Sequence, residues 1–330
     1  MNHKLIMSTL VSFMASSLMA AGPVFKTSMA EDENAFKAGQ TAARKLHVKL
    51  KGVPPKALIV TECFEDKAQK ADVLKGVASV FPKEIIHGGS AYGMYTQEGV
   101  LDIDAVSVLA IGGEVSVDVA FVDHMGAAGL SLETQKEQLV GALRRGGKKL
   151  AQQLPDTRGT TLLILIGDAH SPKNQYLLDG VQEVVGKTLP ITGGSVCKNA
   201  GQNFVYTQGR LTQDSAIAIL LTSTLKVSQV GRQAKSNDQV ISTAREGAAT
   251  AMKSIKEKPA ALFAFDCGGR MGKLDRLEDE LAAIQASVGK EVPLYGCYCA
   301  GEFGPADTAG ASTKTPVGVG WHIMVSLLGN

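Results

Sequence analysis

Short apolar runs alternate with longer amphipathic stretches along most of the chain. The short runs are rich in Ile, Val and Leu at successive positions, which is typical of strands that are covered on both faces. The clearest runs are Ala57–Cys63, Leu162–Ile166, Ala216–Leu221 and Ala261–Cys267. The longer stretches have apolar residues three and four positions apart, which predicts helices. These helices are expected at Lys67–Val80, Asn174–Val185 and Leu274–Val288, and each is followed by a proline that ends it, at Pro82, Pro190 and Pro293.

This alternation occurs three times, in modules of roughly 100 residues. Each module begins with an amphipathic stretch, at Asn34–Lys51, Ser131–Leu154 or Asp238–Lys258. Each module then passes through a Gly-containing turn and a polar hairpin into a last apolar strand, predicted at Ala105–Ile111, Ala216–Leu221 and Gly318–Leu328. The turns are Gly88-Gly89-Ser90, Gly193-Gly194-Ser195 and Gly296-Cys297-Tyr298. The sequence therefore predicts an α/β fold of three repeated α-β-α-β-turn-β modules, which form mixed sheets flanked by helices and whose turns converge on a binding site.

The composition changes at one point along the chain. Residues Ser223–Asp238 are rich in Ser, Gln, Lys and Asn, which is typical of a boundary between domains. The sequence thus predicts one domain of two modules at residues 31–225 and a second domain of one module at residues 238–330.

The first 30 residues have the features of an export signal. Lys4 precedes an apolar run, Leu5–Ala21, that falls short of the roughly 20 residues needed to span a membrane. Ser28-Met29-Ala30 offers small residues for a signal peptidase, and a cut after Ala20 or Ala21 is the alternative. We expect residues 1–30 to be a signal peptide and the mature protein to be periplasmic or secreted, without stable membrane insertion.

The charge balance argues against a nucleic-acid partner. Without residues 1–30 the chain has 32 basic and 32 acidic residues. A nucleic-acid binder gathers Lys and Arg to neutralise phosphates. The only basic cluster, at residues 144–149, lies on a predicted helix and is interpreted as a solvated face.

Two segments of the third module resemble a known family. Ala261–Arg270 is a strand that ends in Cys-x-x-Arg, and Gly296–Pro305 contains a turn with Gly301-Glu302. These segments resemble the C-terminal part of the FIST sensory domain family, and Ala57–Gly113 is similar to its N-terminal part. The resemblance implies an input domain for small ligands, with amino acids suggested, and some relatives are similar to haem proteins that sense nitric oxide. Because the chain has an apparent signal peptide and no room for an output domain, we expect a separate signalling protein as its partner.

The third module also offers a constellation that suits a small zwitterion. Asp266 and Cys267 stand at the end of a strand, where open α/β sheets bind ligands. The planar fork of Arg270 suits a carboxylate, and Glu302 on the next turn suits an amino group. The alternative is that Arg270 and Glu302 pair with each other and brace the two loops. The candidate ligand-binding residues are Gly89, Ser90, Gly194, Ser195, Asp266, Cys267, Arg270, Tyr298 and Glu302.

The cysteines and histidines leave further functions open. In an exported chain Cys267 could form a disulfide with Cys297 or Cys299, while Cys63 stays reduced. Cys267 could also be the nucleophile of a hydrolase or transferase, which would need a neighbouring base. A haem-based gas sensor would need an axial ligand, for which the candidates are His87, His124, His170 and His322. The leading prediction is an exported small-molecule-binding protein, whose ligand is an amino acid or another small carboxylate, with no metal and no catalytic residue.

Overall fold

The computed structural model describes residues 22–197, 203–308 and 311–330. The apolar run Leu5–Ala21 of the predicted signal peptide lies outside the described residues. Among the helices in the described ranges, none combines the length and the apolar composition needed to cross a membrane.

Three modules with the same order of elements follow one another along the chain. The first comprises β1 (Pro23–Glu31), α1 (Ala35–Leu50), β2 (Pro55–Glu62), α2 (Lys67–Ala78), the 3-10 helix η1 (Lys83–Ile85), β3 (Ile86–Ser90), β4 (Met94–Thr96), β5 (Gly99–Leu101) and β6 (Ala105–Gly113). The second comprises β7 (Ser116–Val122), α3 (Lys136–Ala151), β8 (Leu162–Gly167), α4 (Asn174–Val185), β9 (Ile191–Ser195), β10 (Val205–Thr207), β11 (Arg210–Thr212) and β12 (Ala216–Thr222). The third comprises β13 (Lys226–Gln233), α5 (Asn237–Met252), β14 (Ala261–Cys267), α6 (Gly268–Met271), α7 (Leu277–Val288), β15 (Leu294–Cys299), β16 (Glu302–Thr308), β17 (Ala311–Val319) and β18 (His322–Gly329). The predicted α/β fold of three repeated modules is confirmed.

The modules are interlocked by their hairpins. Each of the three six-stranded sheets contains four strands of one module and the hairpin of another, in the orders β1-β6-β2-β3-β10-β11, β17-β16-β9-β8-β12-β7 and β13-β18-β14-β15-β4-β5. The hairpin of the first module thus extends the sheet of the third, that of the second extends the first, and that of the third extends the second. This exchange closes a ring, so the two predicted domains are not separate structural units.

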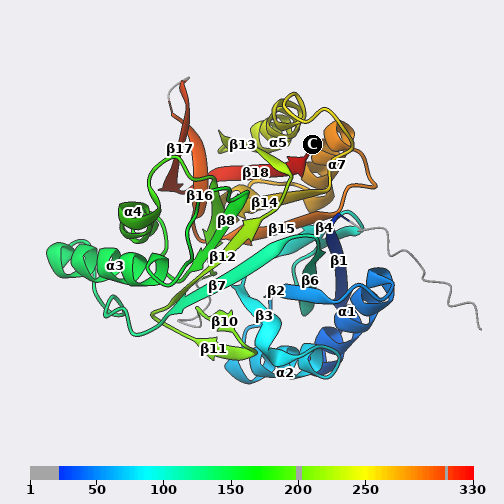
Figure 1. The fold of residues 1–330 in the computed structure, drawn as a ribbon, viewed down its shortest axis with the longest axis horizontal. Helices are drawn as coiled ribbons and strands as arrows, with labels where there is room; N and C mark the ends of the chain where they lie inside the picture. Colours follow the sequence, from blue (N-terminus) through cyan, green and yellow to red (C-terminus); the bar gives the residue numbers. More distant parts are fainter. Residues whose placement is uncertain (1–21, 198–202, 309–310) are drawn as a thin grey trace, which may run out of the picture.

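Each sheet lies between a central core and an outer pair of helices. Figure 1 shows the pairs α1–α2, α3–α4 and α5–α7 at three separate places on the outside of the molecule. Along the central strand of each module, alternate residues face the two layers. Ile164 and Phe263 belong to the core shared by all three modules, whereas Leu163 and Leu262 pack toward the helices. Burial on both faces explains why these strands are apolar at successive positions.

The first strand of every module was not predicted from the sequence. β1, β7 and β13 are each the edge strand of a sheet and pair antiparallel with β6, β12 and β18 respectively. β7 and β13 are largely half-buried and carry polar residues, so they lack a continuous apolar run. The predicted boundary Ser223–Asp238 therefore contains β13 rather than a linker. The predicted strand Gly318–Leu328 is also interrupted, because the chain turns at residues 320–321 between β17 and β18.

The strand β1 also bears on the predicted cleavage site. Residues Pro23–Glu31 pair with β6 along their whole length, from Pro23 opposite Gly113 to Glu31 opposite Ala105. A cut after Ala30 would remove this strand and expose the edge of β6. A cut after Ala20 or Ala21, the alternative site, leaves the described fold intact.

Candidate functional site

Equivalent residues follow the central strand of each module. In register, Glu62 lies opposite Ser90, Gly167 opposite Ser195, and Asp266 opposite Tyr298. The residues that come next are Cys63, Asp168 and Cys267, which therefore occupy one position in the repeat. Each of the three lines a cavity, of about 360, 430 and 440 Å³ respectively. The cavities lie where ligands of open α/β sheets bind, at the carboxyl ends of strands.

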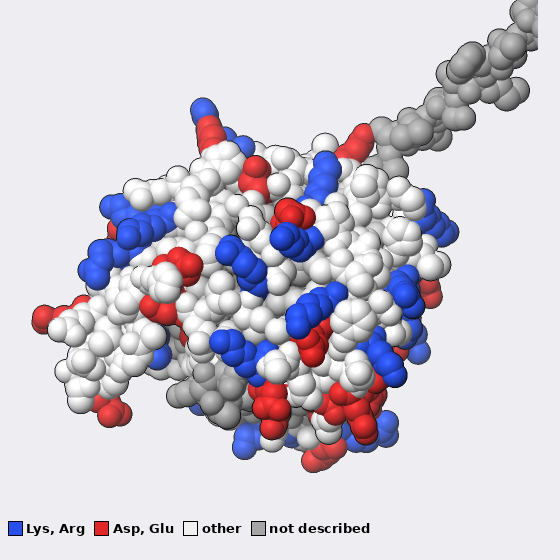
Figure 2. All heavy atoms as spheres, turned by 90° about the horizontal axis from the view of Figure 1, so that it is seen from below, with Lys and Arg blue, Asp and Glu red and all other residues white. Residues whose placement is uncertain are grey.

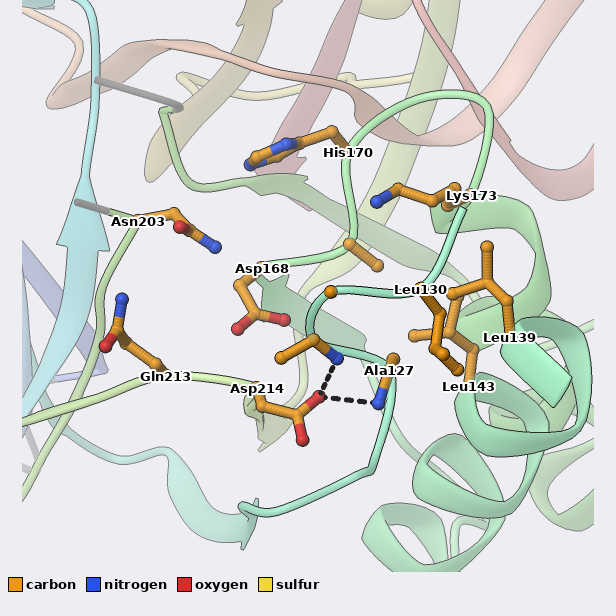
Figure 3. Close-up of a pocket in the computed structure, with 13 residues that line it drawn as sticks. Ala127, Leu130, Leu139, Leu143, Asp168, His170, Lys173, Asn203, Gln213 and Asp214 are labelled. Carbon is orange, nitrogen blue, oxygen red and sulfur yellow. Dashed lines mark hydrogen bonds between the residues drawn. The ribbon is translucent and has the colours of Figure 1, made fainter. Parts of the chain in front are cut away.

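The cavity of the second module, here called the Asp168 cavity, combines acidic, basic and amide side chains. Its polar lining residues are Asp168, His170, Lys173, Asn203, Gln213 and Asp214. Figure 3 shows the Asp168 carboxylate in the middle, with Asn203 and Gln213 on one side and Lys173 on the other. Leu130, Leu139 and Leu143 form an apolar wall. The walls of the cavity thus contain charged groups of both signs and an apolar surface.

Asp168 is the titratable centre of this cavity. Its Oδ2 accepts a hydrogen bond from the backbone N–H of Ser215 at 3.1 Å. Burial is the main cause that raises the pKa of Asp168 to about 7; the backbone N–H of Ser215 and the Lys173 ammonium oppose this rise, and the charge of Asp214 contributes to it. At neutral pH the carboxyl group is therefore close to half ionised, and a nearby cation would favour its charged form.

Asp214 fixes the wall of the cavity. Its carboxylate accepts hydrogen bonds from the backbone N–H groups of Gly126 at 2.6 Å, Ala127 at 2.9 Å and Ala128 at 3.1 Å, and the last two are drawn in Figure 3. Asp214 itself has a φ of 49°, a left-handed conformation that Asp tolerates better than most residues. The loop after β7 is thereby held against the turn before β12.

The predicted ligand anchor Arg270 is a structural brace instead. Its side chain is fully buried and donates from Nε to Asp266 at 2.7 Å and from Nη2 to Glu280 at 2.6 Å. Nη1 donates to the Thr243 hydroxyl at 3.0 Å, and Nη2 also donates to the Val240 carbonyl at 3.2 Å. These bonds tie β14 to α5 and α7. The predicted alternative of a brace is closer to the structure, but the partners are Asp266 and Glu280 rather than Glu302.

Tyr298 and Asp266, two other candidates, belong to this brace. The Tyr298 hydroxyl donates to Glu280 Oε2 at 3.0 Å. Burial, and then the proximity of Asp266, raise the pKa of Glu280 well above its usual range. Two buried carboxyl groups beside one guanidinium favour retention of a proton between them. Neither Asp266 nor Tyr298 lines the Asp168 cavity or the cavities at Cys63 and Cys267.

Glu302 is buried beside Cys267 rather than facing an amino group. Its Oε2 accepts the backbone N–H of His322 at 3.2 Å, and burial raises its pKa well above the usual range. The Cys267 thiol lies against the same carboxyl group and lines its own cavity. Burial, and then Glu302, raise the pKa of Cys267 to about 12, so this residue is a thiol at neutral pH. A protonated thiol is a poor nucleophile, which counts against the predicted cysteine enzyme.

All five cysteines are free, so the predicted disulfide of Cys267 is absent from the structure. The Sγ atoms of Cys297 and Cys299 are 3.5 Å apart, whereas a disulfide needs about 2.0 Å. Cys297 and Cys299 belong to the central core, whereas Cys267 is buried at the wall of its cavity.

The Gly-containing turns do converge, as predicted. Gly89, Ser90, Gly194 and Ser195 meet Cys297 at the centre of the three modules. The space between them is only about 10 Å³, which is at most the volume of one water molecule. The turns therefore form a packed centre, and these four candidates do not face a ligand-sized cavity.

The four candidate haem ligands lie apart. His87 is buried, its pKa is lowered to about 4 by burial, and its ring hydrogen-bonds with Thr207. His322 is held by the Gly320 carbonyl, His124 is exposed, and His170 lines the Asp168 cavity. Within residues 22–197, 203–308 and 311–330, no group of three or more His, Cys, Asp and Glu side chains could hold a metal ion.

Asp168, Lys173 and Asp214 were not predicted from the sequence. The position of Asp168 could have indicated a site residue, since it follows the run Leu162–Ile166 by two residues, in the same position as Cys63 and Cys267 in the other modules. Asp214 had none, because its role depends on a loop some 90 residues earlier that donates to its carboxylate.

Comparison with solved structures gives distant likenesses to the whole chain. Two cyanuric acid hydrolase structures, the second from A. caulinodans, each align with 93% of this chain and with 99% and 100% of their own, at 11% and 10% identity and TM-scores of 0.46 and 0.43. PurL of T. maritima complexed with FGAR aligns at 11% identity over 95% of this chain and 75% of its own, with a TM-score of 0.28. A search of curated proteins found no match.

The family models give a more definite result. The FIST N domain matches residues 56–237 and the FIST C domain matches residues 207–305. The two matches overlap across β11 to β13, in line with modules that are interlocked rather than divided into two domains. FIST domains are associated with sensory binding of small ligands. The chain therefore belongs to the FIST family, as the motifs of its third module predicted.

Proposed function

We propose that this FIST protein binds a free amino acid, or a small molecule that likewise carries an ammonium and a carboxylate group, in the Asp168 cavity. The observation that supports this proposal is the position of Asp168 and Lys173 on the walls of one cavity of about 430 Å³. Opposite charges on the walls of one cavity match a zwitterion.

Asp168 is suited to the ammonium group. Burial raises the pKa of Asp168 to about 7, which means that the protein alone stabilises the ionised carboxylate poorly. A bound ammonium would stabilise the carboxylate and displace its proton. Lys173, on the side of Asp168 away from Asn203 and Gln213 (Figure 3), offers a donor for the carboxylate of the same ligand.

The apolar wall of the cavity indicates what kind of side chain the ligand has. Leu130, Leu139 and Leu143 supply an apolar surface on which an aliphatic side chain can pack. Pockets that combine such a surface with a few convergent polar groups are typical of small-molecule sites. An amino acid with an apolar side chain therefore fits this cavity better than a purely ionic ligand.

The proposal is tested by calorimetric titration of the purified protein with the twenty amino acids, one at a time. The variant Asp168→Asn should lose binding of whichever amino acid the native protein binds, and should remain folded because it removes a charge that burial disfavours. Glu114→Gln, an exposed acid outside the cavity, is the matched control. Absence of binding by the native protein, or equal binding by Asp168→Asn, would contradict the proposal.

The pKa of Asp168 gives this site a pH dependence. The ammonium of a free amino acid stays protonated from pH 6 to pH 8, while Asp168, with a pKa of about 7, changes from mostly protonated to mostly ionised. The affinity should therefore rise about tenfold over this range, and the dependence should vanish in Asp168→Asn. An affinity that falls with pH would show that the proton is not on Asp168.

We also propose that the protein is exported and acts in the periplasm or outside the cell, where it passes its signal to a separate protein. The support is the apolar run Leu5–Ala21 followed by small residues. Cleavage after Ala20 or Ala21 would preserve β1.

A further inference from the structure

A second cavity, at the carboxyl end of β14, has aromatic residues in its walls, whereas the Asp168 cavity is lined by charged residues. This aromatic cavity has a volume of about 440 Å³. All three modules contribute to it: Tyr92 comes from the first, His170 and Ser171 from the second, and Cys267 and Trp321 from the third. Its walls therefore exist only when the ring of modules is closed.

Two glycines, here called the floor of the cavity, lie directly against its aromatic rings. A Cβ atom on Gly268 would lie 2.5 Å from Cδ2 of Tyr92, and a Cβ on Gly269 would lie 3.2 Å from Cη2 of Trp321. The two aromatic rings thus rest directly on backbone, with no side chain between them and the main chain. A cavity lined by two aromatic rings suits an aromatic ligand.

Trp321 is held in this place at a conformational cost. Its φ is 65°, a left-handed conformation that is a real outlier for a bulky side chain. The Lys235 ammonium lies 5.8 Å from the centre of the indole ring, and the Trp321 carbonyl accepts the backbone N–H of Ala234 at 3.2 Å. Strained residues of this kind cluster at ligand sites, where the surrounding structure maintains them.

The polar groups near the floor carry little charge. Cys267 and Cys299 both line the cavity, and the pKa of each thiol is raised, that of Cys267 to about 12 by burial. Neutral thiols make favourable contacts with aromatic rings. The floor is therefore apolar, in contrast to the charged Asp168 cavity, although His170 lines both.

We infer that the aromatic cavity is a second ligand site, which takes a flat aromatic molecule that stacks against Trp321 and Tyr92. Stacking on the two rings supplies the affinity and favours an aromatic ring over a saturated ring of similar size. The Ser171 hydroxyl, which also lines the cavity, can orient a polar ring substituent.

The experiment uses the single tryptophan of the chain as its reporter. Protein labelled with 5-fluorotryptophan should give one fluorine resonance, from Trp321, and titration with indole should shift it in a saturable way. Cyclohexanol, which is of similar size but not flat, should leave the resonance in place. No saturable shift with indole, or an equal shift with cyclohexanol, would overturn the inference.

Variants separate this site from general affinity for aromatic compounds. Trp321→Gly should lose indole binding in ligand-observed NMR yet stay folded, because glycine adopts a φ of 65° without strain. Phe36→Leu, which removes an exposed aromatic ring on α1 outside the cavity, should bind indole as the native protein does. Asp168→Asn should also bind indole normally, so failure of the amino-acid proposal and failure of this one are distinguishable. Retention of indole binding by Trp321→Gly would refute the second site.

Discussion

Replacement of Arg270 by lysine tests whether this residue holds the fold or a ligand. The guanidinium makes four hydrogen bonds, to Asp266, Glu280, Thr243 and the Val240 carbonyl, at 2.6 to 3.2 Å. Lysine keeps the positive charge, but a single ammonium cannot reach acceptors that three separate nitrogens now serve. At least one carboxyl group would lose its partner while remaining fully buried.

The size of the effect follows from the bonds that are lost. A hydrogen bond to a charged group contributes about 1.5 to 3 kcal/mol, and a buried group left without a partner costs a similar amount. We expect Arg270→Lys to lower the free energy of unfolding by about 2 to 4 kcal/mol, short of the about 3 to 5 kcal/mol that complete removal of one partner of a buried ion pair costs. Ligand affinity of the folded fraction should not change.

Equilibrium urea unfolding, followed by circular dichroism, measures this difference. The matched control is Arg276→Lys, since Arg276 is largely exposed and lies 3.9 Å from Glu278 in a surface ion pair. That change should alter the free energy of unfolding by less than about 0.5 kcal/mol. If Arg270→Lys is as stable as the control, or if it unfolds normally but loses its ligand, the assignment of Arg270 as a brace is incorrect.

Three other outcomes follow from the packing. Gly180→Ala should lower the free energy of unfolding in urea by about 1 to 3 kcal/mol, because its Cβ would overlap the Arg144 backbone where α3 and α4 touch. Gly141→Ala, whose Cβ would meet only the flexible end of Arg145, should leave the free energy of unfolding unchanged. Equal effects of the two variants would argue against the close contact at Gly180. Cys197 and Cys297, which are buried and line none of the three cavities, should react with a disulfide reagent only after unfolding, when all five thiols should titrate; a peptide map with a native disulfide would disprove this. Amino-terminal sequencing of exported protein should find a start near residue 21 or 22, and a start at Glu31 would mean that β1 is dispensable.

Much of the fold could be predicted because it depends on local pattern. Central strands such as β8 lie between two apolar layers, so they are apolar at successive positions, and the helices between them show one apolar face. The module was thus identified apart from its first strand. β7 and β13 are half-buried and partly polar, so nothing in their composition separates them from loops.

The candidate site was harder to predict because the same residue types have opposite roles in different modules. Arg270 and Lys173 are both basic residues shortly after a central strand. Arg270 turns back within α6 onto Asp266 of its own strand, whereas Lys173 lines a cavity. The second module has Gly167 where the third has Asp266, so it has no buried acid at that position to form such a pair.

The sequence by itself determined the repeat, the alternation of strands and helices, and membership of the FIST family, because these depend on residues that are close together along the chain. Only the tertiary structure decided which module has a cavity with charged groups of both signs on its walls. Glu280 and Val240 reach Arg270 from elements up to 30 residues away, and the walls of the aromatic cavity come from three modules. The hairpin exchange that brings these groups together depends on pairing between strands as far apart as β4 and β15. Such contacts are selected by packing of the complete chain, and no local pattern specifies them.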